Sequence, residues 1–180
     1  MQLTETKLPG VVLVEPKVYG DERGWFAEVY NRERFAGSGL PSEFVQDNQS
    51  FSRRGVLRGL HYQLVKPQGK LVRVLEGHIW DVAVDLRRGS EHFGEWVGVD
   101  LKGDSLKSLW IPEGFGHGFV VLSETATVLY KATNLYFPEG ERCIRWDDPA
   151  LGIAWPIEGM TPSVSAKDAA GVALGDAEVF

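Results

Sequence analysis

The sequence lacks the residues on which several protein classes depend. Among its 180 residues there is one cysteine, Cys143, so an internal disulfide and a multi-cysteine metal site are excluded. The four histidines form no H-x-H or H-x-x-x-H pair, which leaves only weak support for a metal site built from scattered ligands. The chain has no apolar run of 18 residues that could span a membrane, and residues 1–10 do not resemble a secretory signal. These absences favour a cytoplasmic protein.

Positive charge is also scarce. The 19 lysines and arginines are outnumbered by 25 acidic residues, and a net charge of −6 argues against nucleic-acid binding. No G-x-G-x-x-G follows a predicted strand, and the P-loop and nucleophile-elbow motifs are absent. Basic residues nevertheless gather at Arg53, Arg54, Arg58, Lys70 and Arg73. Such a group is usually a solvated face, but in an acidic chain it also suggests a local diphosphate site.

Short runs of β-branched and aromatic residues dominate the chain and are separated by 21 glycines and nine prolines. Strands that recur about every 8–12 residues are typical of an all-β sandwich or barrel. The length fits one domain over residues 1–180, without an internal repeat or a linker. We therefore expect an all-β fold with short peripheral helices.

The pattern assigns most of the chain to individual elements. A cap residue and two glycines predict a helix over residues 31–39, and a second short helix is expected near 166–173. Glu76-Gly77 divides residues 70–86 into two arms that we interpret as a hairpin, with one face of the second arm buried and the other partly polar. Further strands are expected over residues 11–19, 25–30, 44–51, 56–63, 96–101, 108–111, 119–122, 127–136 and 142–146, with a turn at 20–24.

Several polar residues lie inside these predicted strands. A strand histidine such as His61 is usually a core residue satisfied by hydrogen bonds, but Arg58, Gln63 and Lys70 nearby favour a functional role. Tyr130 would share one sheet face with residues 132, 134 and 136 if the strand is regular. It is either an aromatic core residue or a proton donor.

A glycine-rich segment over residues 111–119 contains His117. Glycines allow the backbone to approach a ligand closely, although a tight loop at the rim of a barrel would need them equally.

Eight motifs, in this order, resemble the dTDP-4-dehydrorhamnose 3,5-epimerase family. They lie at residues 21–24 (DERG), 44–48 (FVQDN), 55–63 (GVLRGLHYQ), 68–70 (QGK), 110–115 (WIPEGF), 117–119 (HGF), 130–131 (YK) and 146–149 (WDDP). The resemblance implies a cupin-like jelly roll, a homodimer, and neither metal nor redox cofactor. It also implies an isomerase that inverts C3 and C5 of dTDP-4-dehydro-6-deoxyglucose, a step towards dTDP-rhamnose for lipopolysaccharide or cell-wall polysaccharide.

The same resemblance implies roles for individual residues. His61 matches the catalytic base and Asp168 its carboxylate partner, which would fix the imidazole and stabilise its charged form. Tyr130 matches the proton donor, and Lys70 matches a cation placed near the developing enolate oxygen. Tyr136 matches a residue that stacks on thymine. The other positions that match substrate-binding residues are Arg23, Glu28, Gln46, Asp47, Asn48, Arg58, His117, Glu141 and Lys167.

Two of these assignments conflict in a regular strand. Arg58 and His61 are three positions apart, so their side chains would point to opposite faces. A bulge at Gly59, or a loop that carries Arg58, would bring them to the same side.

Other functions remain open at this point. The same fold and the same residues would suit an epimerase that inverts only one carbon of a related dTDP-4-keto sugar. A metal-dependent cupin would need ligands near His61 or His117, and a sugar-nucleotide binding protein would need no catalytic group.

Overall fold

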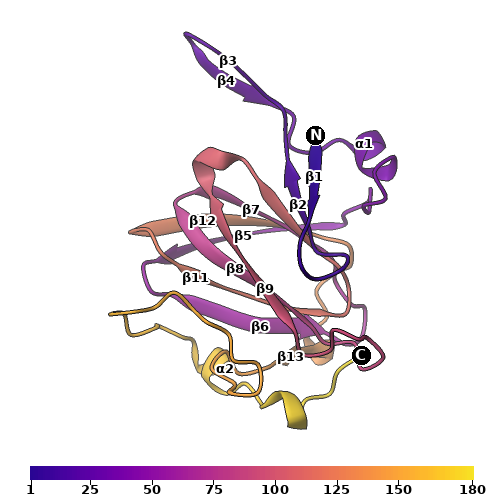
Figure 1. Ribbon diagram of the computed structural model, residues 1–180, viewed down its shortest axis with the longest axis vertical. Helices are drawn as coiled ribbons and strands as arrows, with labels where there is room; N and C mark the ends of the chain where they lie inside the picture. The colour runs from indigo at the N-terminus through magenta and orange to yellow at the C-terminus, as the bar shows by residue number, and fades with distance from the viewer.

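Two antiparallel β-sheets lie face to face in this computed structural model, which describes residues 1–180 (Figure 1). In spatial order, the six-stranded sheet contains β1 (Gln2–Glu5), β2 (Val12–Glu15), β10 (Ser108–Ile111), β7 (Lys70–Glu76), β12 (Thr125–Ala132) and β5 (Gln46–Arg53). The five-stranded sheet contains β13 (Glu141–Cys143), β6 (Leu57–Gln63), β11 (Phe115–Val121), β8 (His78–Asp85) and β9 (Trp96–Lys102). The expected all-β jelly-roll sandwich is confirmed.

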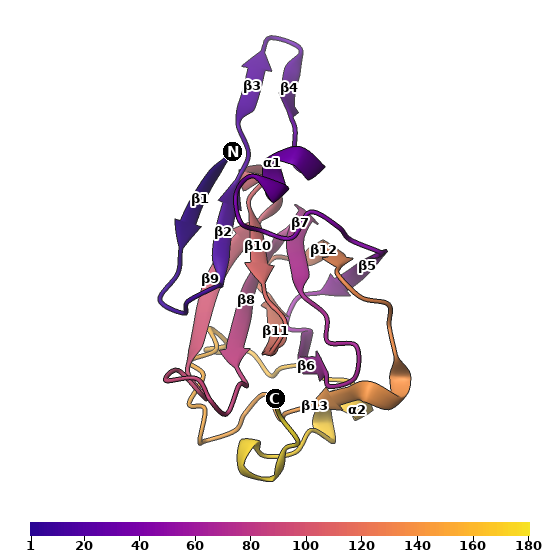
Figure 2. The ribbon, with the colours of Figure 1, turned by 90° about the vertical axis from the view of Figure 1, so that its right-hand side faces the viewer.

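The remaining elements are small and lie outside the two sheets. β3 (Val18–Asp21) and β4 (Gly24–Ala27) form a hairpin that projects away from the sandwich (Figures 1 and 2). The two α-helices, α1 (Arg32–Ala36) and α2 (Ala166–Ala169), are short, as are the 3₁₀ turns η1 (Gly103–Ser105), η2 (Pro138–Gly140) and η3 (Leu174–Asp176). None of these helices has the length and apolar character needed to cross a membrane.

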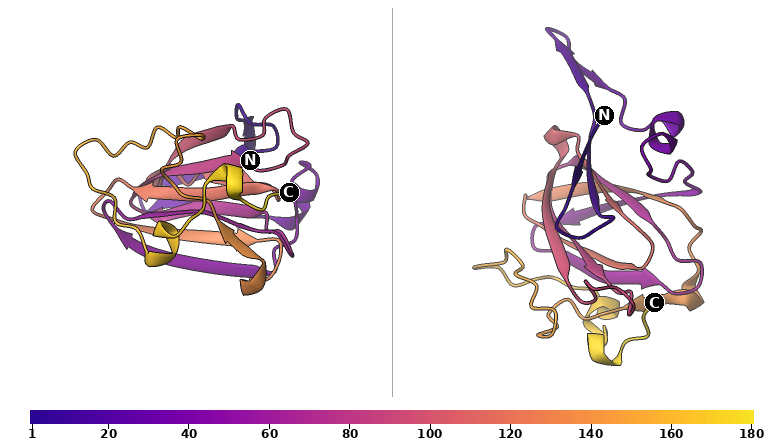
Figure 3. Two further views of the ribbon diagram at one scale, coloured as in Figure 1. Left: turned by 90° about the horizontal axis from the view of Figure 1, so that it is seen from below. Right: turned by 45° about the vertical axis from the view of Figure 1, so that its right-hand side comes forward.

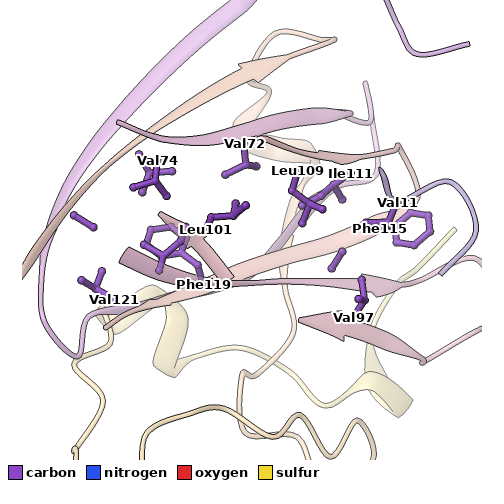
Figure 4. Packing of buried hydrophobic residues seen from close by; sticks show 14 of the residues in the cluster. Val11, Val72, Val74, Val97, Leu101, Leu109, Ile111, Phe115, Phe119 and Val121 are labelled. Carbon is purple, nitrogen blue, oxygen red and sulfur yellow. The ribbon is translucent and has the colours of Figure 1, made fainter. Parts of the chain in front are cut away.

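The hydrophobic core occupies part of the space between the sheets. Val72 and Val74 from β7 meet Phe119 and Val121 from β11, and Leu101 packs beside them (Figure 4). A second buried cluster lies on the outer face of the five-stranded sheet, where the chain that follows β13 covers it (Figure 3). Because both of its faces are covered, β11 is buried over its whole length.

The prediction of a hairpin over residues 70–86 is wrong. Glu76-Gly77 does join β7 to β8, but β7 pairs with β10 and β12 while β8 pairs with β11 and β9, in the other sheet. The chain therefore crosses between the layers at this point. Gly77 has a φ of +88°, and a Cβ there would lie 2.1 Å from the carbonyl oxygen of Thr125. A two-residue turn and a corner between sheets place the same demands on the local sequence.

The second arm of that segment, β8, is buried on both faces. Val82 and Val84 belong to the cluster under the C-terminal chain, whereas Ile79 and Ala83 belong to the core between the sheets. The partly polar face predicted for this strand is therefore an interior face. Its Asp81 is fully buried.

Most other predicted elements are present, with changed ends. The strand expected at residues 11–19 is divided into β2 and β3 around Pro16, which cannot donate a backbone hydrogen bond. Helix α1 begins after Asn31, whose side chain accepts a hydrogen bond from the backbone of Arg34. β12 ends at Ala132, so Asn134 does not share its face and instead donates to the carbonyl of Pro67.

The corner at Gly77 generates a stability prediction. We expect Gly77→Ala to lower the free energy of unfolding by about 2 kcal/mol or more, because the residue must keep a positive φ beside the Thr125 carbonyl. Gly89→Ala is the matched control, since no atom lies within 4 Å of its Cβ position. Denaturant unfolding of both variants measures the difference, and equal midpoints would contradict this interpretation.

Candidate active site

A cavity of about 240 Å³ opens between the sheets beside the hydrophobic core. Phe119 and Tyr130 separate the two regions, because they contact the core and also line the cavity. The complete lining comes from β5, β6, β7, β11, β12 and neighbouring segments: Asn48, Ser50, Arg58, His61, Gln68, Lys70, His117, Gly118, Phe119, Tyr130, Ala132 and Glu141. Seven of these twelve residues are among those expected at the site.

His61 and Asp168 form a close contact at one wall of the cavity. His61 Nε2 lies 2.6 Å from Asp168 Oδ1, and Asp168 is only 3% exposed. The contact lies off the direction in which Nε2 would donate, so we treat it as a charge contact rather than a linear hydrogen bond. Burial opposes ionisation of Asp168, but His61 and Ser165 outweigh it and hold the pKa of the carboxyl well below its usual range. The ionised carboxylate can therefore stabilise the imidazolium that would form if His61 accepts a proton.

Two local features bring Asp168 to His61. Ser165 caps α2 by accepting from the Asp168 backbone, and its hydroxyl donates to Asp168 Oδ2 over 2.6 Å. The backbone N–H of Gly59, 109 positions away along the chain, donates to Asp168 Oδ1 over 3.2 Å. The C-terminal chain is in turn attached beside β6, because Val56, the residue before that strand, pairs with Ser163.

Of the two arrangements that would bring Arg58 and His61 to one side, the structure has the bulge at Gly59. Along β6 and β11, His61 faces His117 but Arg58 faces Phe119, so the register shifts between these two pairs. Gly59 has a φ of +115°, and a Cβ there would lie 2.5 Å from the Cα of Gly118. The bulge directs both Arg58 and His61 into the cavity.

Tyr130 enters the cavity from β12, in the opposite sheet to His61. Its hydroxyl lies 2.9 Å from Ser50 Oγ on the neighbouring strand β5. Burial raises the pKa of Tyr130, so the phenol is protonated at neutral pH and has a proton to donate.

Lys70 lies on β7, in the same sheet as Tyr130. Burial lowers the pKa of Lys70 to about 8, although Asp81 and Glu141 act in the opposite direction. Its Nζ donates to the backbone carbonyl of His61 over 3.4 Å. The side chain therefore supplies a largely desolvated cation at neutral pH, which can also be neutralised in mildly alkaline solution.

His117 and Arg58 also line the cavity, and each has a buried partner behind it. His117 Nε2 lies 2.9 Å from Oδ2 of the buried Asp81. Arg58 donates from Nε and Nη2 to Ser52 Oγ, both over 3.1 Å. These partners restrict the orientation of the imidazole and the guanidinium.

Several of the other expected binding residues form a connected rim. Gln46 Nε2 donates to Asn48 over 2.9 Å, and Gln46 Oε1 accepts from the backbone of Tyr136 over 2.8 Å. The Tyr136 hydroxyl donates to Glu141, which forms an ion pair with Lys167. This network leaves the half-exposed ring of Tyr136 accessible to a flat base.

Three expected binding residues are not brought into the cavity. Asp47 has the opposite strand parity to Asn48, and its carboxylate pairs with Lys131 over 2.8 Å. Arg23 lies at the tip of the projecting hairpin, where it pairs with Asp21, and Glu28 follows that hairpin. Within one chain, these side chains do not line the cavity.

The sequence analysis missed several residues of the cavity. Ser50 shares its parity in β5 with Asn48, and this alternation is the signal that could have identified it. Asp81, which lies behind His117, could have been suspected because it is one of two aspartates in a mostly apolar strand. Gln68 also lines the cavity, and its side-chain amide donates a hydrogen bond to the carbonyl of Asn134 over 2.8 Å.

One group of side chains has the composition of a metal site. Ligand atoms of His61, Cys143 and Asp168 lie within 4.8 Å of one another. Burial raises the pKa of the Cys143 thiol to about 12, which disfavours the thiolate that a metal would need. The arrangement fits a base with its carboxylate partner better than it fits a set of ligands.

Comparisons with known proteins agree with this geometry. The family described as dTDP-4-dehydrorhamnose 3,5-epimerase matches residues 5–176. The enzyme of that name from Pseudomonas aeruginosa is 55% identical over 100% of this chain and 99% of its own. A crystal structure from Legionella pneumophila, dTDP-6-deoxy-D-glucose-3,5-epimerase in complex with dTDP-4-keto-L-rhamnose, superposes with a TM-score of 0.95 and 48% identity over 98% of this chain and 94% of that one. A 3′-monoepimerase from Streptomyces bikiniensis is more distant, with a TM-score of 0.89 and 33% identity over 94% and 86% of the two chains.

Proposed function

The chain belongs to the dTDP-4-dehydrorhamnose 3,5-epimerase family, and we propose that it carries out the family's reaction with His61 as base and Tyr130 as proton donor. The protein is an isomerase that inverts C3 and C5 of dTDP-4-dehydro-6-deoxyglucose to give dTDP-4-dehydrorhamnose. A cytoplasmic location is part of the proposal, because a single cysteine suits a reducing compartment.

The observation that carries the mechanism is the position of the two groups in opposite sheets. His61 projects from β6 and Tyr130 from β12 into one cavity. A sugar held between them presents one face to the imidazole and the other to the phenol. Removal of a proton on one face and its replacement from the other inverts the carbon.

The C4 ketone makes the hydrogens on the adjacent carbons, C3 and C5, acidic enough to be removed. His61 removes the proton from the adjacent carbon, and the electron pair moves into an enolate whose oxygen is the former ketone oxygen. Asp168 stabilises the imidazolium that forms, and Lys70 stabilises the enolate. Tyr130 then gives its proton to the opposite face, and solvent restores both groups.

Substrate binding is assigned to the cavity mouth. Arg58 suits the diphosphate because a guanidinium makes paired hydrogen bonds with phosphate oxygens. The ring of Tyr136 offers a stacking surface for thymine. The carboxylate of Asp47 is paired with Lys131, so a contact between Asp47 and the substrate would be made by its backbone.

The proposed division of roles is tested by two substitutions. We expect His61→Asn to lower inversion at both carbons by a factor of about 10³ or more, since proton removal then lacks its base. Tyr130→Phe is expected to block inversion while solvent deuterium still enters the recovered substrate, because His61 still removes and returns the proton. Proton NMR in heavy water measures both rates.

Binding of dTDP to each variant, followed by calorimetry, is the control for a preserved cavity. Turnover retained by His61→Asn would exclude His61 as the base. Equal loss of exchange and inversion in Tyr130→Phe would exclude a donor role for that residue.

The low pKa of Lys70 generates a prediction about pH. Lys70 carries its charge below about pH 8 and loses it as the pH rises through that value. We therefore expect kcat/KM, which reports the free enzyme, to decline above about pH 8. In Lys70→Gln, kcat/KM should be about 10²-fold lower and this alkaline decline should be absent. An unchanged decline in that variant would mean that another group titrates.

We propose that the protein is a homodimer in which each subunit contributes residues to the cavity of the other. In the hairpin that carries Arg23, Trp25 is 61% exposed and Phe26 is 69% exposed. A second copy of the chain would cover this apolar surface. The position of the hairpin away from the cavity suggests that Arg23 and Glu28 serve the cavity of the partner.

Subunit mixing tests this arrangement. If Arg23 acts across the dimer, Arg23→Ala and His61→Asn homodimers are each impaired, but a mixed dimer contains one site with both residues intact. Mixing and reassociation should therefore restore activity, up to about a quarter of the wild-type rate for random pairing. Sedimentation of a monomer at micromolar concentration, or no recovery from mixed dimers, would refute the proposal.

A further inference from the structure

Strand β5 directs two serines towards functional side chains of the cavity. Ser50 and Ser52 have the same parity in this strand. Ser50 Oγ lies 2.9 Å from the Tyr130 hydroxyl, and Ser52 Oγ accepts two hydrogen bonds from Arg58. Neither serine was expected at the site from the sequence.

The direction of the Ser50–Tyr130 hydrogen bond determines whether the phenol can act as an acid. Each hydroxyl has one proton and can also accept. If Tyr130 donates to Ser50, its proton is not directed at the substrate. If Ser50 donates to Tyr130, the phenolic proton is free to point into the cavity. Ser50 is the only hydrogen-bond partner of the Tyr130 hydroxyl in the structure.

We propose that Ser50 is a positioning residue that donates its hydroxyl proton to the Tyr130 oxygen, so that the phenolic proton is directed at the substrate carbon. The inference rests on the donor role of Tyr130 proposed above. Once Tyr130 has given up its proton, the same hydrogen bond stabilises the phenolate that remains.

The electrostatic environment of the phenol supports this role. Burial raises the pKa of Tyr130, and the nearby Asp81 carboxylate acts in the same direction. The hydrogen bond from Ser50 lowers that pKa, and the positive charge of Arg58 assists it. Ser50 therefore offsets part of the burial that would otherwise make Tyr130 a poor acid.

Three variants separate this role from a structural one. Ser50→Ala removes the hydroxyl and leaves the aromatic ring in place. Ser50→Thr keeps a hydroxyl on a residue suited to a strand. Ser52→Ala is the matched comparison, because it is the same substitution on the same face of the same strand but contacts Arg58 instead of Tyr130. Thermal unfolding is the control that tests whether each variant is folded.

The measurement compares two rates in heavy water, on the wild-type protein and each variant, with dTDP-4-dehydro-6-deoxyglucose. One is inversion, and the other is deuterium incorporation into substrate of unchanged configuration. In Ser50→Ala we expect the ratio of exchange to inversion to rise about 10- to 100-fold, which is the effect of losing a hydrogen bond to a charged group. Ser50→Thr should restore the ratio to within about threefold. Ser52→Ala should raise KM and leave the ratio unchanged.

The outcomes distinguish this inference from the proposed function. If the wild-type protein inverts neither carbon, the proposed function fails, whatever the variants do. If the wild type is active and Ser50→Ala keeps the wild-type ratio, Ser50 does not position the donor. A rise of equal size in Ser52→Ala would also overturn the inference, because the effect would then belong to the strand as a whole.

Discussion

The close contact between His61 and Asp168 is the constraint on which the rest of the site depends. A carboxylate that is 3% exposed stays ionised here only because His61, Ser165 and the backbone of Gly59 surround it. Those partners come from a bulged strand and from a capped helix far along the chain. The C-terminal chain thus has two structural roles, since it covers the five-stranded sheet and also places Asp168 against His61.

The space between the two sheets contains both the hydrophobic core and the cavity. Apolar side chains fill one part, and the other part is the cavity, with Phe119 and Tyr130 at the boundary. Two polar side chains of the cavity are held by buried partners: Asp81 lies behind His117, and Ser52 lies behind Arg58. These contacts restrict the orientation of the imidazole and the guanidinium, so substrate binding need not order them.

The sequence predicted those features whose signals are local. The cap at Asn31 and the strand runs follow from backbone chemistry. The conflict between Arg58 and His61 was also visible, but the sequence left open whether a bulge at Gly59 or a loop resolves it, and the structure has the bulge. The corner at Gly77 could not be distinguished from a hairpin, because the partners of β7 and β8 lie far away in the chain. The candidate catalytic residues His61 and Lys70 were selected through family motifs. Ser50 and Asp81 were missed because serine and aspartate are common in strands and turns, and only tertiary contacts distinguish these two.

The most direct test of the central claim follows the fate of the two carbon-bound hydrogens. The wild-type protein is incubated with dTDP-4-dehydro-6-deoxyglucose in heavy water, and proton NMR locates deuterium in the inverted product. A base and a donor on opposite sides of one cavity predict deuterium at both C3 and C5 of the 4-dehydrorhamnose product. Deuterium at one carbon alone, or binding of the nucleotide sugar without any exchange, would contradict the account.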